Sequence, residues 1–405
     1  MTIRASIGLI SLLMLLPPQL PADDSTGSCD HHIAQWLDPR SGKVLQGEQL
    51  FERLAKANIV LLGEAHTTAA HHRWQAYMLG ALHSRRNDMM VGFEMVPRRL
   101  QSVLDDWTAG QLSEDDFLEQ VEWEKVWGYD AGYYLPLFHF ARLNRLPAIG
   151  LNVDRSLVSR VAREGWESID AADRDGLSDP APASEAYREA LARLYGYKQS
   201  LRAAEDEGGA GHGEIDLEEI RNSDEFANFL AAQQTWDRGM AETLATAHRI
   251  NPSALVVGII GRGHLEYGYG IPHQLADLGI DGVEVLIPLN TKDTCDPLNP
   301  EFASAVFVVD AEDVAESPPG PRLGVFIENA DSGVRIKEII EDSVAEASGL
   351  LADDIILRAA DFETTTTAEL IEVVKRQAPG TWLPLNIRRG DEELQLIAKF
   401  PQRFE

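Results

Sequence analysis

Two short motifs place histidines where chemistry is possible. The tetrapeptides Gly63–His66 and Gly261–His264 have the form G-x-x-H, and each follows an apolar run typical of a buried strand. Glycine lets the backbone turn sharply as it leaves a sheet, and parallel strands would bring both imidazoles to one edge, where Glu64 and Glu94 add carboxylates. Such a set can hold a divalent metal ion, or serve as a general base with its orienting partner. Two loop histidines bonded only to the backbone are the alternative.

Polar residues also interrupt the apolar face of a helix expected near residues 226–244. Gln233 and Asp237 lie four residues apart on a face that otherwise carries large apolar side chains. A buried polar group is costly unless it is paired, so we expect both to point at a polar cavity, with the capping of a loop as the alternative. His72 and Gln75 likewise share one face of the helix that follows the first motif, and Arg155 closely follows a further strand.

Aromatic residues gather in two clusters that contain glycines, at residues 123–136 and 267–272. Tyrosines in such clusters can line a flat apolar pocket, and a phenolate can ligate ferric haem. Ordinary core packing is the alternative for any single aromatic residue. Tyr134 belongs to the first cluster, and Tyr267 follows His264 closely in the second.

Strands and helices alternate regularly around these residues. Five apolar runs, at residues 58–62, 89–93, 147–151, 254–260 and 282–287, are separated by stretches of helical spacing. Continuous apolar runs predict strands buried on both faces, and therefore an α/β domain with a mostly parallel sheet and flanking helices. Residues 166–222 are acidic and rich in alanine and glycine, and we expect a helical subdomain there.

The composition limits the classes of partner. Of 405 residues, 44% are hydrophobic and 25% are charged, which is ordinary for a globular protein. With 36 Lys and Arg against 65 Asp and Glu, the formal net charge is −29. A chain this acidic repels a nucleic-acid backbone, so we expect no nucleic-acid partner.

The first 22 residues predict a secretory signal peptide. Arg4 precedes an apolar run from Ile7 to Leu16, too short to span a bilayer, and a small-residue exit follows at Ala22. A retained membrane anchor is the alternative. A periplasmic or secreted protein meets an oxidising environment, where Cys29 and Cys295 can form a disulfide, with two free thiols as the alternative.

From about residue 30 to residue 300, the sequence resembles the ChaN-like family, the haem-binding uptake proteins of the Tiki superfamily. The matching segments follow in order at residues 63–66, 72–75, 92–95, 134–136, 152–155, 232–241 and 263–272. The resemblance implies an α/β core with a helical subdomain, haem as cofactor, binding often in a homodimer, and a link to iron acquisition. It implies that the cofactor is contacted by Tyr134, Tyr267, His72, Gln233 and Asp237, of which the two tyrosines are candidate iron ligands.

More distant superfamily members are hydrolases built around two G-x-x-H motifs and a glutamate, so the resemblance leaves a metal-dependent hydrolase or protease open. In that alternative His66, His264 and Glu64 would hold the ion, Glu94 would activate its water and Arg155 would steady the developing oxyanion. The sequence contains no H-E-x-x-H or nucleophile-elbow motif that would support catalysis independently. It also lacks the lipobox of the lipoprotein members of the family.

Residues 322–402 resemble a PDZ domain of the bacterial, protease-associated kind, after a proline-rich linker expected at residues 301–321. Residues 343–350 match its S-x-A-x-x-x-G-L helix and turn. The resemblance implies that a peptide C-terminus would add as an extra strand at a loop formed by Leu323, Gly324, Val325 and Phe326, beside a helix that carries Leu370 and Val374. The usual turn glycines are replaced at 353–354 and 360–361, so a domain kept only for packing is the alternative.

Overall fold

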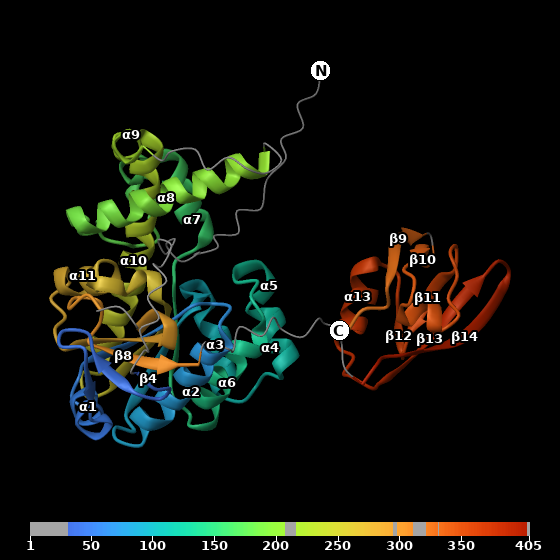
Figure 1. Cartoon of the computed structure of the whole chain (residues 1–405), viewed down its shortest axis with the longest axis horizontal. Coiled ribbons are helices and arrows are strands. Elements are labelled where there is room, and N and C mark those ends of the chain that lie inside the picture. Colours follow the sequence, from blue (N-terminus) through green and yellow to red (C-terminus); the bar gives the residue numbers. More distant parts are fainter. Residues whose placement is uncertain (1–30, 207–215, 295–297, 311–320, 331, 403–405) are drawn as a thin grey trace. The chain divides into compact units, whose positions relative to one another are not determined.

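The computed structural model describes residues 31–206, 216–294, 298–310, 321–330 and 332–402. The chain divides between residues 313 and 314 into two compact units, which are described separately (Figure 1). The predicted signal peptide, Cys29 and Cys295 lie outside the described residues, so export and the disulfide stay predictions. Within the described ranges, no helix has both the length and the apolar character needed to cross a membrane.

The first unit is built on an eight-stranded sheet. Its strands are β1 (Trp36–Asp38), β2 (Lys43–Leu45), β3 (Ile59–Glu64), β4 (Met89–Pro97), β5 (Ala148–Asn152), β6 (Leu255–Gly261), β7 (Val283–Asn290) and β8 (Ala305–Val309). Their order is β2-β1-β8-β7-β3-β6-β4-β5. Pairing is parallel from β8 to β5 and antiparallel where β1 joins β2 and β8. The predicted mostly parallel sheet is therefore confirmed.

Helices cover both faces of this sheet. They are α1 (Gly47–Leu54), α2 (Ala69–His83), α3 (Gln101–Thr108), α4 (Glu114–Gln120), α5 (Trp123–Val126), α6 (Ala131–Leu143), α7 (Arg155–Glu164), α8 (Glu185–Asp206), α9 (Leu217–Arg221), α10 (Asp224–Ile250) and α11 (Ile271–Asp277). Successive strand residues point to opposite faces. In β3, Val60 and Leu62 therefore pack with α1, α2 and α6, while Ile59 and Leu61 pack with α10 and α11. All of β3 is buried, which explains its unbroken apolar run.

The described residues between β5 and β6 include a group of helices. α7 begins after Asp154, whose side chain accepts a hydrogen bond from the N–H of Ser156, and ends at Gly165, which has a positive φ of 77°. α8 and α9 pack against the start of α10 through Tyr187 and Phe226, among others. Figure 1 shows these helices grouped together, with the long α10 running from them to the sheet.

The second unit has a small antiparallel sheet. Its elements are β9 (Val325–Ala330), β10 (Gly333–Ile339), α12 (Val344–Ala347), β11 (Ile355–Ala359), β12 (Phe362–Glu363), α13 (Thr367–Lys375), β13 (Trp382–Arg389) and β14 (Glu392–Lys399). The order is β14-β13-β11-β10-β9, with β12 paired to β11, so β9 is an edge strand. Asn329 in β9 accepts a hydrogen bond from the backbone N–H of Thr367 at 2.7 Å, which ties α13 to this edge. The predicted β-rich domain is confirmed.

Two element boundaries differ from the sequence prediction. Residues 305–309, expected in the linker, form β8 between β1 and β7. The linker was expected to start too early in the chain, because its proline-rich signal lies after β8. β4, expected to end at Phe93, continues to Pro97. Its pairing with β6 nevertheless stops at Phe93, and its register on β5 shifts between Phe93 and Pro97, so Glu94 stands where regular pairing ends.

Candidate functional site

The predicted edge residues meet at the carboxyl ends of three neighbouring strands, β3, β6 and β4. Glu64 ends β3 and lies opposite Gly261, the last residue of β6. The rim network, as we call it, consists of Glu64, His66, Glu94, Asp237 and His264. Apart from His66, its members are at most 4% exposed. The network is therefore mostly enclosed by protein.

His66 and Glu64 form the first histidine–carboxylate pair, with His66 Nδ1 2.5 Å from Glu64 Oε1. Burial by itself would lower the pKa of His66, but the charge of Glu64 and this hydrogen bond outweigh burial and raise that pKa to about 9. Burial would raise the pKa of Glu64, but the charge of His66 reverses this effect and lowers it. The pair is therefore an imidazolium against a carboxylate at neutral pH.

Helix α2 supports the first pair from behind. His72 Nε2 lies 3.1 Å from the backbone oxygen of His66 and 3.9 Å from Glu64 Oε2. Gln75 donates a hydrogen bond to the backbone oxygen of Leu62 in β3 at 3.0 Å. Burial lowers the pKa of His72. This imidazole is therefore neutral, and its Nε2–H can fix the backbone of His66.

His264 and Asp237 form the second pair, which lies inside the protein. His264 Nδ1 is 2.6 Å from Asp237 Oδ1, and the hydroxyl of Tyr187 donates to Asp237 Oδ2 at 2.7 Å. Burial opposes a charge on His264, but the carboxylate of Asp237 outweighs it and raises the pKa of His264. A Cβ on Gly270 would lie 2.8 Å from Asp237 Oδ1, so glycine leaves room for the carboxylate.

Glu94 lies between the two pairs. Its Oε2 accepts a hydrogen bond from the N–H of Gly261 at 2.5 Å, and its Oε1 is 3.7 Å from His264 Nε2. A Cβ on Gly261 would lie 2.7 Å from Cε1 of His66 and 3.4 Å from Oε2 of Glu94. The absence of a side chain at this position therefore lets the histidine of the first motif approach the strand that carries the second.

His66 is the member of the network that a ligand can reach. Its side chain is 11% exposed, against 2% for His264. The rings of Trp127 and Tyr129, both half-buried, lie 4.8 and 4.9 Å from its imidazole, measured between ring centres. The first aromatic cluster thus lines the approach to the network.

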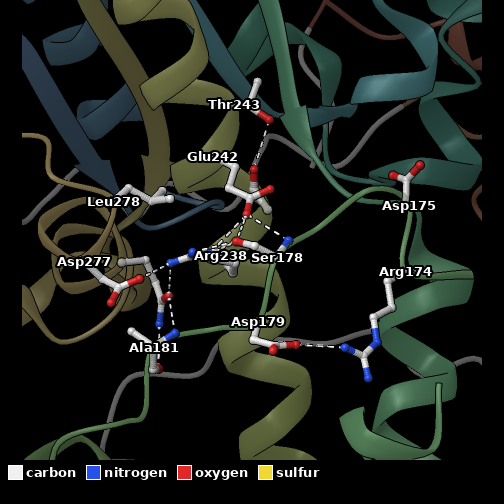
Figure 2. A network of polar contacts seen from close by, with 12 residues as sticks. Arg174, Asp175, Ser178, Asp179, Ala181, Arg238, Glu242, Thr243, Asp277 and Leu278 are labelled. Atoms are coloured by element: carbon white, nitrogen blue, oxygen red, sulfur yellow. Dashed lines mark hydrogen bonds and ion pairs between the residues drawn. The ribbon is translucent and has the colours of Figure 1, made fainter. Parts of the chain in front are cut away.

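A second polar network anchors α10 next to the site. Arg238 is 5% exposed, and it donates to Ser178 Oγ at 2.6 Å, Asp277 Oδ2 at 2.6 Å and Glu242 Oε1 at 3.1 Å. Figure 2 shows these contacts joining α10 to the segment around Ser178 and to the helix that carries Asp277. A buried cation is stable only when it is paired. The network therefore fixes α10, and with it the adjacent Asp237.

The remaining predicted residues differ in their distance from the rim network and in their exposure. Tyr134 is fully buried, its hydroxyl is 3.5 Å from Glu64 Oε1, and burial raises its pKa well above the ordinary value. Tyr267 is half-buried, and its ring stacks on Tyr269 at 5.2 Å. Gln233 is 4% exposed on α10, and Arg155 is exposed at the start of α7. The roles given to these residues stay predictions.

The predicted metal site at His66, His264 and Glu64 gains no support from this geometry. In the described part of the chain, no group of three or more His, Cys, Asp or Glu side chains is arranged to hold a metal ion. Each of the two histidines faces a carboxylate through Nδ1, as metal-bound imidazoles also do, so the metal role of these residues stays a prediction.

The loop predicted to receive a peptide carboxylate has a conformation that requires glycine. Gly324 has a φ of 80°, and a Cβ there would lie 2.3 Å from Cβ of Ser343. Phe326 is 57% exposed, whereas Leu370 and Val374 are 1% and 8% exposed and belong to the core. The two replaced turn glycines are accommodated, because Asp353 and Ala360 take positive φ values of 69° and 50° themselves.

Sequence reasoning missed two residues that matter at the rim. Tyr187 was not singled out, because it is one of three tyrosines in a long helix and no local pattern marks its partner fifty residues away. Arg238 was also missed, although a charged residue beside Asp237 on a largely buried helix is itself a signal that paired polar groups lie near.

Comparison with known proteins identifies both domains. A family model described as "Haem-binding uptake, Tiki superfamily, ChaN" matches residues 50–275, more than half of the chain, and a PDZ-domain model matches residues 321–399. The solved structure "Cofacial heme binding to ChaN of Campylobacter jejuni" is 20% identical and covers 67% of this chain and 95% of its own, with a TM-score of 0.48. That score is too low to add to the family match.

The curated relatives are serine proteases. The Do-like HtrA of Bacillus subtilis (strain 168) is 28% identical over 142 residues, and HTRA1 of Xenopus tropicalis is 38% identical over 80 residues. The matches span 33% and 20% of this chain but only 31% and 16% of those relatives, so their activity is not carried over. On the family match, the chain belongs to the ChaN haem-binding uptake family of the Tiki superfamily, and it carries a PDZ domain after that family's domain.

Proposed function

We propose that the large domain binds haem on the accessible side of the rim network. The observation that carries this proposal is the position of His66, the reachable imidazole, beside the rings of Trp127 and Tyr129. Haem is a flat apolar macrocycle with acidic propionate groups. It needs aromatic contact area and a cation, and these three residues offer both in a strongly acidic chain.

Tyr267 is the more exposed of the two predicted iron ligands. Its side chain is half-buried, whereas Tyr134 is 0% exposed and could reach iron only after a rearrangement. A bound haem would supply ferric iron, a Lewis acid that a phenolate can ligate. His72, Gln233 and Asp237 are at most 4% exposed, so in this proposal they hold the site in place. Family membership supports the proposal and extends it to binding in a homodimer.

Hemin titration tests haem binding. The unchanged protein should give a saturable Soret shift, and Tyr267→Phe should alter the shift and weaken binding. His66→Gln should weaken binding by about tenfold, the value of one charge-assisted contact. Tyr195→Phe is the matched control, because Tyr195 is also half-buried and packs against Phe226 and Phe229. No Soret shift, or equal losses in all three variants, contradicts the proposal.

The two histidine–carboxylate pairs favour a second candidate, a hydrolase. The hydrolase expected from the sequence uses a metal ion, and a form that needs no metal ion relies on side chains alone. Glu94 would instead take a proton from water, His66 would act as the acid, and the buried His264 would stabilise the carboxylate of Glu94 at 3.7 Å. Chromogenic esters and peptides test it. Hydrolysis that survives EDTA and disappears in Glu94→Gln supports this candidate, and equal rates in both proteins reject it.

The chain is proposed to act after export, in the periplasm or outside the cell, in iron acquisition, with its PDZ domain binding peptide C-termini. The edge strand β9 and the positive φ of Gly324 support peptide binding. Fluorescence anisotropy with the full chain tests it, using apolar-ended peptides with a free carboxylate and the same peptides amidated. Binding only of the free acids supports the proposal. The mass of protein isolated from its own host shows whether the first 22 residues are removed.

A further inference from the structure

A separate pocket opens in the large domain where β1, β2 and β8 meet α1 and α2. Its volume is about 1050 Å³, at the upper end of the range for small-molecule sites. The described residues that line it include none of the rim network. Trp36, Val44, Phe307 and Asp310, which form part of its wall, lie outside residues 50–275, the segment that matches the family model. The pocket is therefore a feature of this chain in addition to the family's site.

One wall of this pocket is aromatic. The ring of Phe307 lies 6.2 Å from that of Trp74 and 6.4 Å from that of Tyr77, at interplanar angles of 26° and 28°. Trp36 meets Phe307 edge-on at 4.8 Å. Tyr77 is 54% exposed although it carries a large ring. Nearly parallel rings that reach from the core to the surface present a broad face on which a flat molecule can stack.

The pocket also carries polar groups that suit an acid group on such a molecule. The guanidinium of Arg85 lies 4.8 Å over the ring of Phe51, and Arg85 is exposed. A stacked guanidinium keeps N–H donors at its edge for a carboxylate. Trp74 is 3% exposed, and its indole N–H lacks a hydrogen-bond partner among the described residues, which is unusual for a buried donor. A second cation, Arg73, and two carboxylates, Glu48 and Asp310, also line the pocket, so the formal charges balance and the preference for an acid is assigned to the ring-stacked Arg85 rather than to a general positive field.

We propose that this pocket binds a flat aromatic small molecule that carries one acid group. The ring system lies on the wall formed by Trp74, Tyr77 and Phe307, and the acid group meets Arg85. This inference does not rest on haem binding, because the two sites share no described residue, and either can fail without the other.

Two fluorescent probes test the proposal on the full chain. 8-Anilinonaphthalene-1-sulfonate is flat, aromatic and acidic, and N-phenyl-1-naphthylamine has the same rings without the acid. We expect saturable binding of both, with the acidic probe binding more tightly. Arg85→Gln should weaken binding of the acidic probe by about tenfold and change the affinity for the neutral probe by less than about twofold. Tyr77→Ala should weaken both probes, because the stacking face is lost.

Matched controls separate this pocket from non-specific binding. Arg145 and Leu143 are exposed residues outside the pocket, and Arg145→Gln and Leu143→Ala should leave both probes unchanged. Tyr77 and Arg85 are exposed, so their variants should keep the circular dichroism spectrum of the parent. If each probe binds Arg85→Gln as tightly as it binds the parent protein, the role of the acid group is overturned. Unchanged binding of both probes to Tyr77→Ala overturns the site.

Discussion

The two G-x-x-H motifs fold into similar pairs in different surroundings. His66 and His264 each face a carboxylate through Nδ1, at 2.5 and 2.6 Å, and both lie near Glu94. His66 is 11% exposed and has aromatic neighbours at the surface, whereas His264 is 2% exposed and its carboxylate is held by Tyr187. Equal motifs therefore do not imply equal roles. His66 is the histidine that solvent reaches, whereas His264 is enclosed and held by its carboxylate.

The largest expected effect lies in the buried pair. Asp237→Ala should lower the free energy of unfolding by about 3–5 kcal/mol, because it leaves the buried His264 without its partner. Urea denaturation measures this change. The corresponding substitution in the other pair, Glu64→Ala, should lower the free energy of unfolding by less, since water can reach His66. Equal losses in the two variants would remove the distinction between the pairs.

The next effect concerns the hydroxyl that supports Asp237. Tyr187→Phe should lower stability by about 1.5–3 kcal/mol, because it removes a buried hydrogen bond to a charged group. Tyr129→Phe, on the exposed side of the network, should change stability by less than about 0.5 kcal/mol. Thermal unfolding of both variants checks this pair. A larger loss of stability in Tyr129→Phe than in Tyr187→Phe would contradict the view that the pair of His264 and Asp237 is the structural one.

Glycine at the end of β6 should matter more than glycine in the first motif. Gly261→Ala places a Cβ 2.7 Å from His66, and it should destabilise the protein by about 1–3 kcal/mol through overpacking. At Gly63 the nearest atom, in Ile287, would be 3.1 Å away, so Gly63→Ala should have a milder effect. A crystal structure of Gly261→Ala with His66 unmoved would contradict this explanation.

The last effect is a change of stability with pH. The pKa of His66 is raised from 6.5 to about 9, so its contribution to stability is complete below about pH 6.5 and is lost as the pH rises towards 9. The slope for one group is at most about 1.4 kcal/mol per pH unit. His66→Gln should flatten this alkaline decline, although the raised pKa of His264 leaves part of it.

The acid side provides the internal control for this measurement. Burial lowers the pKa of His71 from 6.5 to about 3, so its contribution is present above about pH 6.5 and is lost as the pH falls towards 3. Urea midpoints measured from pH 4 to pH 10 should therefore show a smaller alkaline decline in His66→Gln, while the acid decline that comes from His71 remains. An unchanged alkaline decline in this variant would show that His66 is not held as a cation.

The sequence predicted the sheet, because strands buried on both faces leave unbroken apolar runs such as the one in β3. It also located Glu64, His66, Glu94 and His264 at one edge, since parallel strands align their ends. The pairing of β1 with β8 was not predictable, because it joins residues about 270 positions apart and no local pattern marks it. Tyr187 was missed for the same reason, whereas Asp237 was found because a lone carboxylate on an apolar face needs a partner.

The place of β8 in the large sheet affects how the domain can be isolated. The family match ends at residue 275, before β7 and β8, and the expected linker begins at 301, before β8. A fragment cut at residue 300 would keep β7 but leave bare the side on which β8 pairs with it. An uncovered row of backbone donors and acceptors along an apolar strand invites self-association. Aggregation of such a fragment would therefore reflect where it was cut, and a fragment that extends to Asp310 keeps this edge paired.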